Sequence, residues 1–229
     1  MFIPLYDGVE LRYLKRPIAT YVLLGLNVFV YLTIATGLIG SPQNVGLGLG
    51  MIPAVLFGTA VIDQAIAHVP TWATLITSLF VHGGFFHLAG NMLFLWVFGD
   101  NVEDAMGSLR FTLFYLLSGI AGCLLYAFLD PQSQAPLIGA SGAISGVVVA
   151  YVIFYPRVHV FVLAFAWLPL SITALYIILA WITLQVGSAL FSADQATGWW
   201  AHVGGLIAGA ALTPLLRRPQ VPLFGKRTA

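Results

Sequence analysis

The chain has 229 residues, of which 60% are hydrophobic and only 7% charged, and its formal net charge is +1. Its mean hydropathy is +0.96. Charged residues normally occupy about a quarter of a soluble domain, so this composition excludes a soluble protein, and we expect no nucleic-acid partner. The lipid bilayer is the partner that the composition indicates.

Six apolar stretches predict membrane-spanning helices, because a helix needs roughly 20 apolar residues to cross a bilayer. We therefore predict an all-α, polytopic membrane protein. Its helix bundle occupies residues 17–217, between a cytoplasmic N-terminal segment, 1–16, and a cytoplasmic tail, 218–229. The expected helices are 17–39, 85–101, 108–129, 141–155, 160–187 and 198–216.

The first loop, residues 40–81, is long and almost as apolar as the helices around it. Its apolar pieces, 45–58 and 69–81, are too short to cross comfortably. We expect the loop to lie in the interface or partly embedded against the bundle, with Trp72 as an interfacial anchor.

All nine basic residues fall on one side of this six-helix topology, and the other three loops contain no Lys or Arg. By the positive-inside rule both termini are cytoplasmic. The nine are Arg12, Lys15, Arg16, Arg110, Arg157, Arg217, Arg218, Lys226 and Arg227.

Polar side chains recur at one depth, in the outer half of the bundle: His82, His87 and Asn91; Ser141; and His202. Intramembrane histidines and amides are costly unless they are paired. Helix 141–155 is about 22 Å long against a core of about 30 Å, so we expect its N-terminus to begin below the outer surface. A helix end placed there leaves N–H groups without intrahelical partners, which predicts a water-containing pocket at Ser141.

Glycines predict that the helices carrying Ser141 and His202 touch each other. Gly142 and Gly146 are four residues apart on one helix, and Gly205 and Gly209 are four apart on the other. This is the spacing of small residues at tight helix contacts in membranes.

Each polar group has an ordinary structural interpretation when it is taken alone. Ser141 is then a helix N-cap, His202 a structural or interfacial residue, and His87 and Asn91 hydrogen-bond neighbouring helices. Together they supply the parts of an acyl-transfer site. In that interpretation His202 is the general base, Ser141 the nucleophile, and the Ser141 N–H with His87 and Asn91 the oxyanion donors.

The nearest carboxylates, Asp130 and Asp194, lie in outer loops, so we expect a Ser–His dyad without an acid. A transporter or proton-coupled channel is a rival, because it also uses intramembrane histidines. A metal-dependent hydrolase is a second rival, but the chain has no His-Glu-x-x-His and no carboxylate at that depth. We expect no metal and no small-molecule cofactor.

At these residues the sequence resembles the rhomboid family of intramembrane serine proteases, from the first expected helix to the sixth. The family's motifs appear as His82, His87 and Asn91, as Gly139, Ala140, Ser141 and Gly142, and as Ala201, His202, Gly205 and Gly209.

The resemblance implies hydrolysis of peptide bonds in single-span membrane proteins at the outer side of the bilayer, without a cofactor. It implies a six-helix bundle with an embedded first loop, in a membrane expected to be the prokaryotic plasma membrane. It makes Ser141 the nucleophile and His202 the base, and places His82, Gly139 and Ala140 in the pocket with the oxyanion donors. The sequence departs from the family's pattern at the Trp-Arg pair, where Ala73 follows Trp72. It departs again at the aromatic four residues after the nucleophile, which is Ser145.

Overall fold

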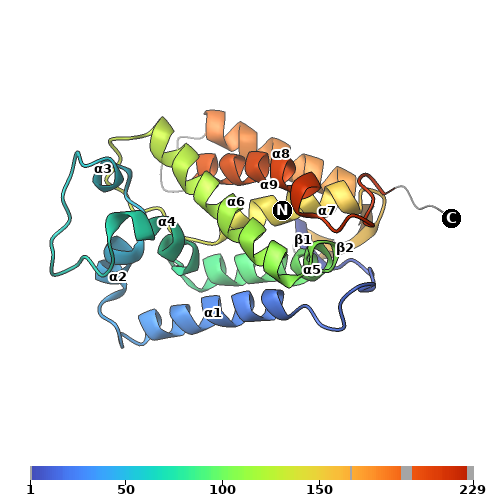
Figure 1. The fold of residues 1–229 in the computed structure, drawn as a ribbon, viewed down its shortest axis with the longest axis horizontal. Coiled ribbons are helices and arrows are strands. Elements are labelled where there is room, and N and C mark those ends of the chain that lie inside the picture. The colour runs from blue at the N-terminus through green and yellow to red at the C-terminus, as the bar shows by residue number, and fades with distance from the viewer. Residues whose placement is uncertain (1, 166, 192–197, 226–229) are drawn as a thin grey trace.

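The computed structural model describes residues 2–165, 167–191 and 198–225. Most of them belong to helices that run roughly side by side (Figure 1). The long helices are α1 (Ile18–Ala35), α5 (Phe85–Met106), α6 (Ser108–Leu129), α7 (Ser141–Phe154), α8 (Ala174–Phe191) and α9 (Trp199–Leu216). The short ones are α2 (Pro42–Leu49), α3 (Pro53–Leu56), η1 (Thr71–Ala73), α4 (Thr74–Thr77) and η2 (Ser78–Phe80). Three strands, β1 (Phe2–Tyr6), β2 (His159–Ala164) and β3 (Leu168–Thr173), complete the fold.

The long helices make this an integral membrane protein, but they do not establish six spans. In the described residues α1, α6, α8 and α9 are long and apolar enough to cross a membrane. A fifth span results if the segment 71–80 and α5, which meet at a bend of 80°, are counted together. Helix α7 has only 14 residues, about 21 Å of helix. The short length expected for the helix that begins at Ser141 is therefore present.

The helix predicted over 160–187 is wrong in its first half. Residues 159–173 form the antiparallel β2–β3 hairpin, and α8 begins only at Ala174 and continues to Phe191. Alternate side chains of β2 are buried, which is the period of a strand, and Pro169 removes a backbone donor that a helix interior would need. Because the hairpin and α8 are both apolar, the hydropathy of the sequence did not distinguish the strand period from the helix period.

The N-terminal segment, expected only to precede the bundle, contributes strand β1. It pairs antiparallel with β2, so that the sheet order is β1-β2-β3 and the fold is helical with a small sheet. The register places Ile3 opposite Leu163, about 160 residues away in the chain. This pairing joins the two sequence regions that lie on either side of helices α1 to α7.

Of its five short helices, the first loop packs α2, α3, α4 and η2 on the bundle, and an isolated β-bridge adds a further contact. Met51 and Leu137 exchange backbone hydrogen bonds of 3.0 and 2.8 Å. The Gly139 N–H donates to the Ser78 carbonyl at 2.9 Å. The loop therefore holds the backbone that leads into Ser141. Trp72 is 68% exposed, as an interfacial anchor would be.

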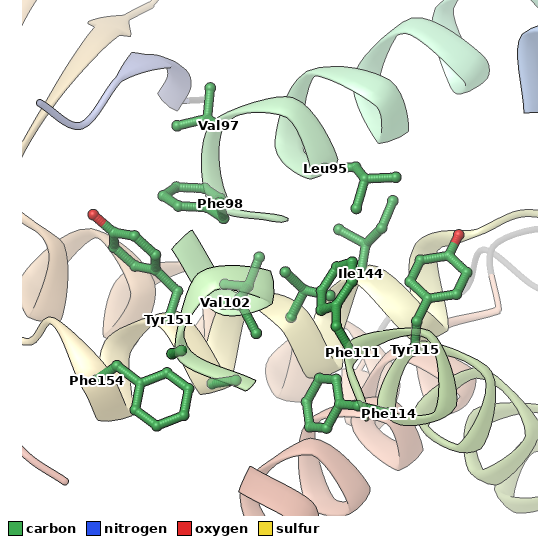
Figure 2. Close-up of a cluster of buried hydrophobic side chains, with 14 of the residues drawn as sticks. Leu95, Val97, Phe98, Val102, Phe111, Phe114, Tyr115, Ile144, Tyr151 and Phe154 are labelled. Carbon is green, nitrogen blue, oxygen red and sulfur yellow. The ribbon is translucent and has the colours of Figure 1, made fainter. Parts of the chain in front are cut away.

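The core lies where α5, α6 and α7 meet. Figure 2 shows large side chains from these helices converging, with Phe98 of α5 against Tyr151 of α7 at 4.8 Å between ring centroids. On α7 every residue from Gly142 to Val148 is buried. Because α7 is enclosed by α5, α6 and α9, its first residue is held on several sides.

Glu103, near the end of α5, caps the start of α1. Its carboxylate accepts hydrogen bonds from the Ala19 and Thr20 N–H groups at 3.0 and 2.7 Å. It also accepts from the hydroxyls of Thr20 and Ser108, at 2.8 and 2.6 Å. Pro17 at the N-cap offers no side-chain cap, so Glu103 supplies the acceptors that the helix end requires.

We expect Glu103→Ala to lower the free energy of unfolding by about 1–3 kcal/mol, because the buried donors at the start of α1 lose their acceptor. Denaturation in mixed detergent and SDS micelles measures the change. Glu10→Ala removes an exposed acid of the segment that precedes α1 and serves as the control. Equal stability of the two variants would contradict the capping role.

Candidate active site

Ser141 is the first residue of α7, and the chain reaches it through a glycine in an unusual conformation. Gly139 has φ = 120°, in the region that side-chain-bearing residues rarely adopt. The N-cap position belongs to Ala140, and no side chain caps the helix. The interpretation of Ser141 as the N-cap is therefore wrong.

The Ser141 hydroxyl contacts the imidazole of His202. His202 lies in the first turn of α9, and its Nε2 is 2.7 Å from Ser141 Oγ. Both side chains are half-buried. At this distance the ring nitrogen can take the hydroxyl proton, provided that its lone pair faces Ser141.

Close contact between α7 and α9 makes this pairing possible. A Cβ at Gly205 would collide with the Gly142 carbonyl oxygen, and a Cβ at Gly209 would lie 2.5 Å from the Gly146 Cα. The four glycines thus face one another in two pairs and allow the backbones to touch. Only such small residues let helices approach this closely.

We expect Gly205→Ala to reduce stability by about 1–3 kcal/mol through overpacking. It should also separate the His202 imidazole from the Ser141 hydroxyl, because His202 lies one turn away on the same helix. Gly25→Ala, at an α1 glycine with nothing within 4 Å, is the control and should be neutral or slightly stabilising. Thermal unfolding of both variants is compared; an unchanged transition for Gly205→Ala would contradict the packing argument.

His87 and Asn91 converge on Gly139, two residues before Ser141. A Cβ at Gly139 would lie 2.7 Å from His87 Nε2 and 3.8 Å from Asn91 Nδ2. Asn91 is 7% exposed, and its Nδ2 has no acceptor among the described residues. A buried donor without an acceptor is rare in folded proteins and is suited to a ligand oxygen. His82, 4% exposed, lies edge-on to His87 at 5.1 Å between centroids.

A cavity of about 490 Å³ opens beside His87, Gly139, Ser141 and His202. This volume lies within the range of small-molecule and peptide side-chain sites. Residues of the long helices α5 to α9, of η2 and of the segments before α5, α7 and α9 contribute to its wall. They include His87, Tyr126, Gly139, Ser141, Gln185 and His202.

Two side chains outside the sequence motifs contact His202. Gln185 of α8 has its amide Nε2 3.0 Å from His202 Nδ1, and Trp199 meets the ring edge-on at 5.7 Å between centroids. Ser145 instead donates to the Ser141 carbonyl at 2.7 Å. The sequence signal for Gln185 was available, because it is the one amide side chain between Ala174 and Phe191.

The carboxylates considered as a third member take no part in the described site. Asp130 is the C-cap residue of α6, and Asp194 lies outside the described residues. Within the described part of the chain no Asp or Glu lines the cavity. Those residues also contain no cluster of three His, Cys, Asp or Glu that could hold a metal ion.

A family model described as "Rhomboid domain" matches residues 69–219, which include all the motif residues. The chain is 31% identical to "Rhomboid protease GluP" of Bacillus subtilis over 93% of its own length and 37% of that protein. It is 30% identical to "Rhomboid protein 1, mitochondrial" of Saccharomyces cerevisiae over 62% of the chain and 41% of that protein. It is also 36% identical to "Inactive rhomboid protein 1" of Drosophila melanogaster, over 37% of the chain and 6% of that protein.

The chain thus spans less than half the length of each of these relatives. One of them is named a protease and another is named inactive, so the residues at the site must decide between the two. The domain match covers about two thirds of the chain, and the similarity to the Bacillus protein covers nearly all of it. This chain belongs to the rhomboid family.

Proposed function

We propose that the protein is an intramembrane serine endopeptidase that cleaves transmembrane segments with a Ser141–His202 dyad. The observation that carries the proposal is the 2.7 Å contact between Ser141 Oγ and His202 Nε2 at the wall of the cavity. A transporter has no need of a hydroxyl paired with an imidazole at a helix start. The similarity to a relative named a protease supports the same activity.

In the proposed reaction His202 Nε2 takes the proton of Ser141 as Oγ attacks the substrate carbonyl carbon. The carbonyl oxygen becomes an oxyanion, and the proton on Nε2 then passes to the leaving amine as the C–N bond breaks. Water hydrolyses the acyl-enzyme by the same steps, with His202 again as base. The Ser141 hydroxyl is restored.

The oxyanion would be stabilised by donors already gathered near Gly139. Asn91 Nδ2, which has no acceptor among the described residues, and the imidazole of His87 approach Gly139 from α5. The first N–H groups of α7 add the positive end of its helix dipole. Donors that are held in place before the reaction stabilise developing charge most effectively.

The proposed substrates are transmembrane segments of other proteins, and no cofactor or metal is needed for these steps. A transmembrane peptide bond is normally shielded by its own helix and by lipid. The cavity offers a site among the helices, with polar side chains in its wall, where such a bond can meet water and the dyad. Gly139 lines its wall, whereas Ala140 does not, and His82 contacts the cavity residue His87 without lining the cavity itself.

The proposed location is the plasma membrane of a prokaryote, with both termini in the cytoplasm. Arg12, Arg110, Arg157 and Arg217 lie near the starts or ends of helices opposite to the end that carries Ser141 and His202. The positive-inside rule places that basic end in the cytoplasm and the cavity toward the outer side.

Labelling with a fluorophosphonate probe in intact membranes tests this function directly. The wild-type protein should be labelled, and Ser141→Ala should not be. Ser171→Ala, at an exposed serine of β3, should label like the wild type. Labelling that survives in Ser141→Ala would exclude this serine as the nucleophile.

A further inference from the structure

Gln185 is a buried amide on a helix that otherwise turns little polar surface inward. Between Leu179 and Phe191 it is the one buried residue of α8, with 4% of its surface exposed. Burying an amide costs free energy unless it is hydrogen-bonded. Its partner is His202 Nδ1, at 3.0 Å.

The ring nitrogen that Gln185 contacts decides whether His202 can act as a base. A neutral imidazole carries one proton, on Nδ1 or on Nε2. When the proton is on Nδ1, the Nε2 lone pair faces Ser141 Oγ and can accept the hydroxyl proton. When the proton is on Nε2, that nitrogen can only donate to Ser141 and the dyad is inactive.

The amide of Gln185 can stabilise either tautomer, since it ends in an acceptor on one side and a donor on the other. With Nε2 toward His202, as in the structure, the amide donates and Nδ1 is unprotonated. A half-turn of the terminal amide brings Oε1 to the same place, where it accepts from Nδ1–H. The position of the side chain then stays the same while the tautomer of the ring is exchanged.

We propose that Gln185 is the positioning residue of the catalytic base, and that its Oε1 accepts the Nδ1–H hydrogen bond in the reactive dyad. This inference rests on the proposed function. The Ser141 proton moves to Nε2, and the ring becomes an imidazolium whose Nδ1–H stays hydrogen-bonded to Oε1. The Nε2 proton then leaves with the amine product, and the Nδ1 proton is never transferred.

The titratable side chains around the cavity allow this role to be tested with a carboxylate at position 185. His87 on α5 and Cys123 and Tyr126 on α6 are the other titratable side chains that line the cavity among the described residues. No Asp, Glu, Lys or Arg of that part of the chain lines it. An acid at position 185 would therefore be the nearest one to His202.

Two substitutions separate hydrogen bonding from packing. Gln185→Leu keeps similar bulk without an acceptor and should lower kcat about 10- to 100-fold, with KM little changed. Gln185→Glu offers only acceptors, so it should retain activity. It should also move the acid limb of the kcat/KM profile upward by about one pH unit or more, because a carboxylate stabilises the imidazolium. Leu184→Ala, at the neighbouring exposed position, is the control and should match the wild type.

Nitrogen-15 NMR of histidine-labelled protein reads the tautomer without relying on turnover. The His202 signals are assigned by their loss in His202→Ala. Gln185→Leu should change the ratio of the two tautomers, and Leu184→Ala should leave it unchanged. An unaltered ratio and kcat in Gln185→Leu, or an unmoved acid limb in Gln185→Glu, would overturn the inference. If instead the wild-type protein shows no serine-dependent cleavage, it is the proposed function that fails.

Discussion

Ser141→Ala is expected to abolish cleavage of a reporter that carries one transmembrane helix, with a loss of about 10⁴-fold or more in kcat. The substitution removes the hydroxyl that lies 2.7 Å from His202 Nε2. His202→Ala should cost about as much, because nucleophile and base act as one unit and their losses do not add. Cleavage is measured in proteoliposomes with purified protein.

Two comparisons make this result specific. His159→Ala, at an exposed histidine of β2, should cleave at the wild-type rate. The unfolding transition of Ser141→Ala should match that of the wild type, since the hydroxyl is half-buried and makes no helix cap. Substantial turnover by folded Ser141→Ala would reject the dyad. Asp130→Asn as damaging as His202→Ala would reject a dyad without an acid.

Asn91→Ala is expected to lower kcat by about 10²–10³, the loss typical of one oxyanion donor. Asn91 Nδ2 is buried, has no acceptor among the described residues, and lies near Gly139 beside His87. KM should change little, because the donor bonds the oxygen more strongly as charge develops in the transition state. Steady-state kinetics on the same reporter separate the two constants.

Asn91→Asp sharpens the experiment, because it keeps the size of the side chain and replaces its donors with a negative charge. It should be at least as damaging as Asn91→Ala if the group faces an oxyanion. Asn44→Ala, at an exposed amide of α2, is the matched control and should have no effect. A rise in KM with unchanged kcat in Asn91→Ala would instead indicate a substrate-binding role.

The largest difference between sequence and structure lies at residues 159–173. Hydropathy alone merged the β2–β3 hairpin with α8 because both are apolar, and the alternation of β2 is only six residues long. The pairing of β1 with β2 depends on contacts between distant segments, which no local pattern contains. The same holds for Glu103, whose carboxylate caps a helix more than 80 residues earlier in the chain.

The sequence by itself determined the membrane class, the short helix at Ser141, the two glycine pairs and the motif residues. These follow from local quantities: the apolar length of a segment, the spacing of small residues, and the residue types that acyl transfer requires. Only the tertiary structure decided which groups contact His202, because Gln185 reaches it from another helix and a single buried amide has no periodic signature. It also decided that Ser141 is not the cap of its helix, since the packing of α9 against α7 turns the hydroxyl toward an imidazole.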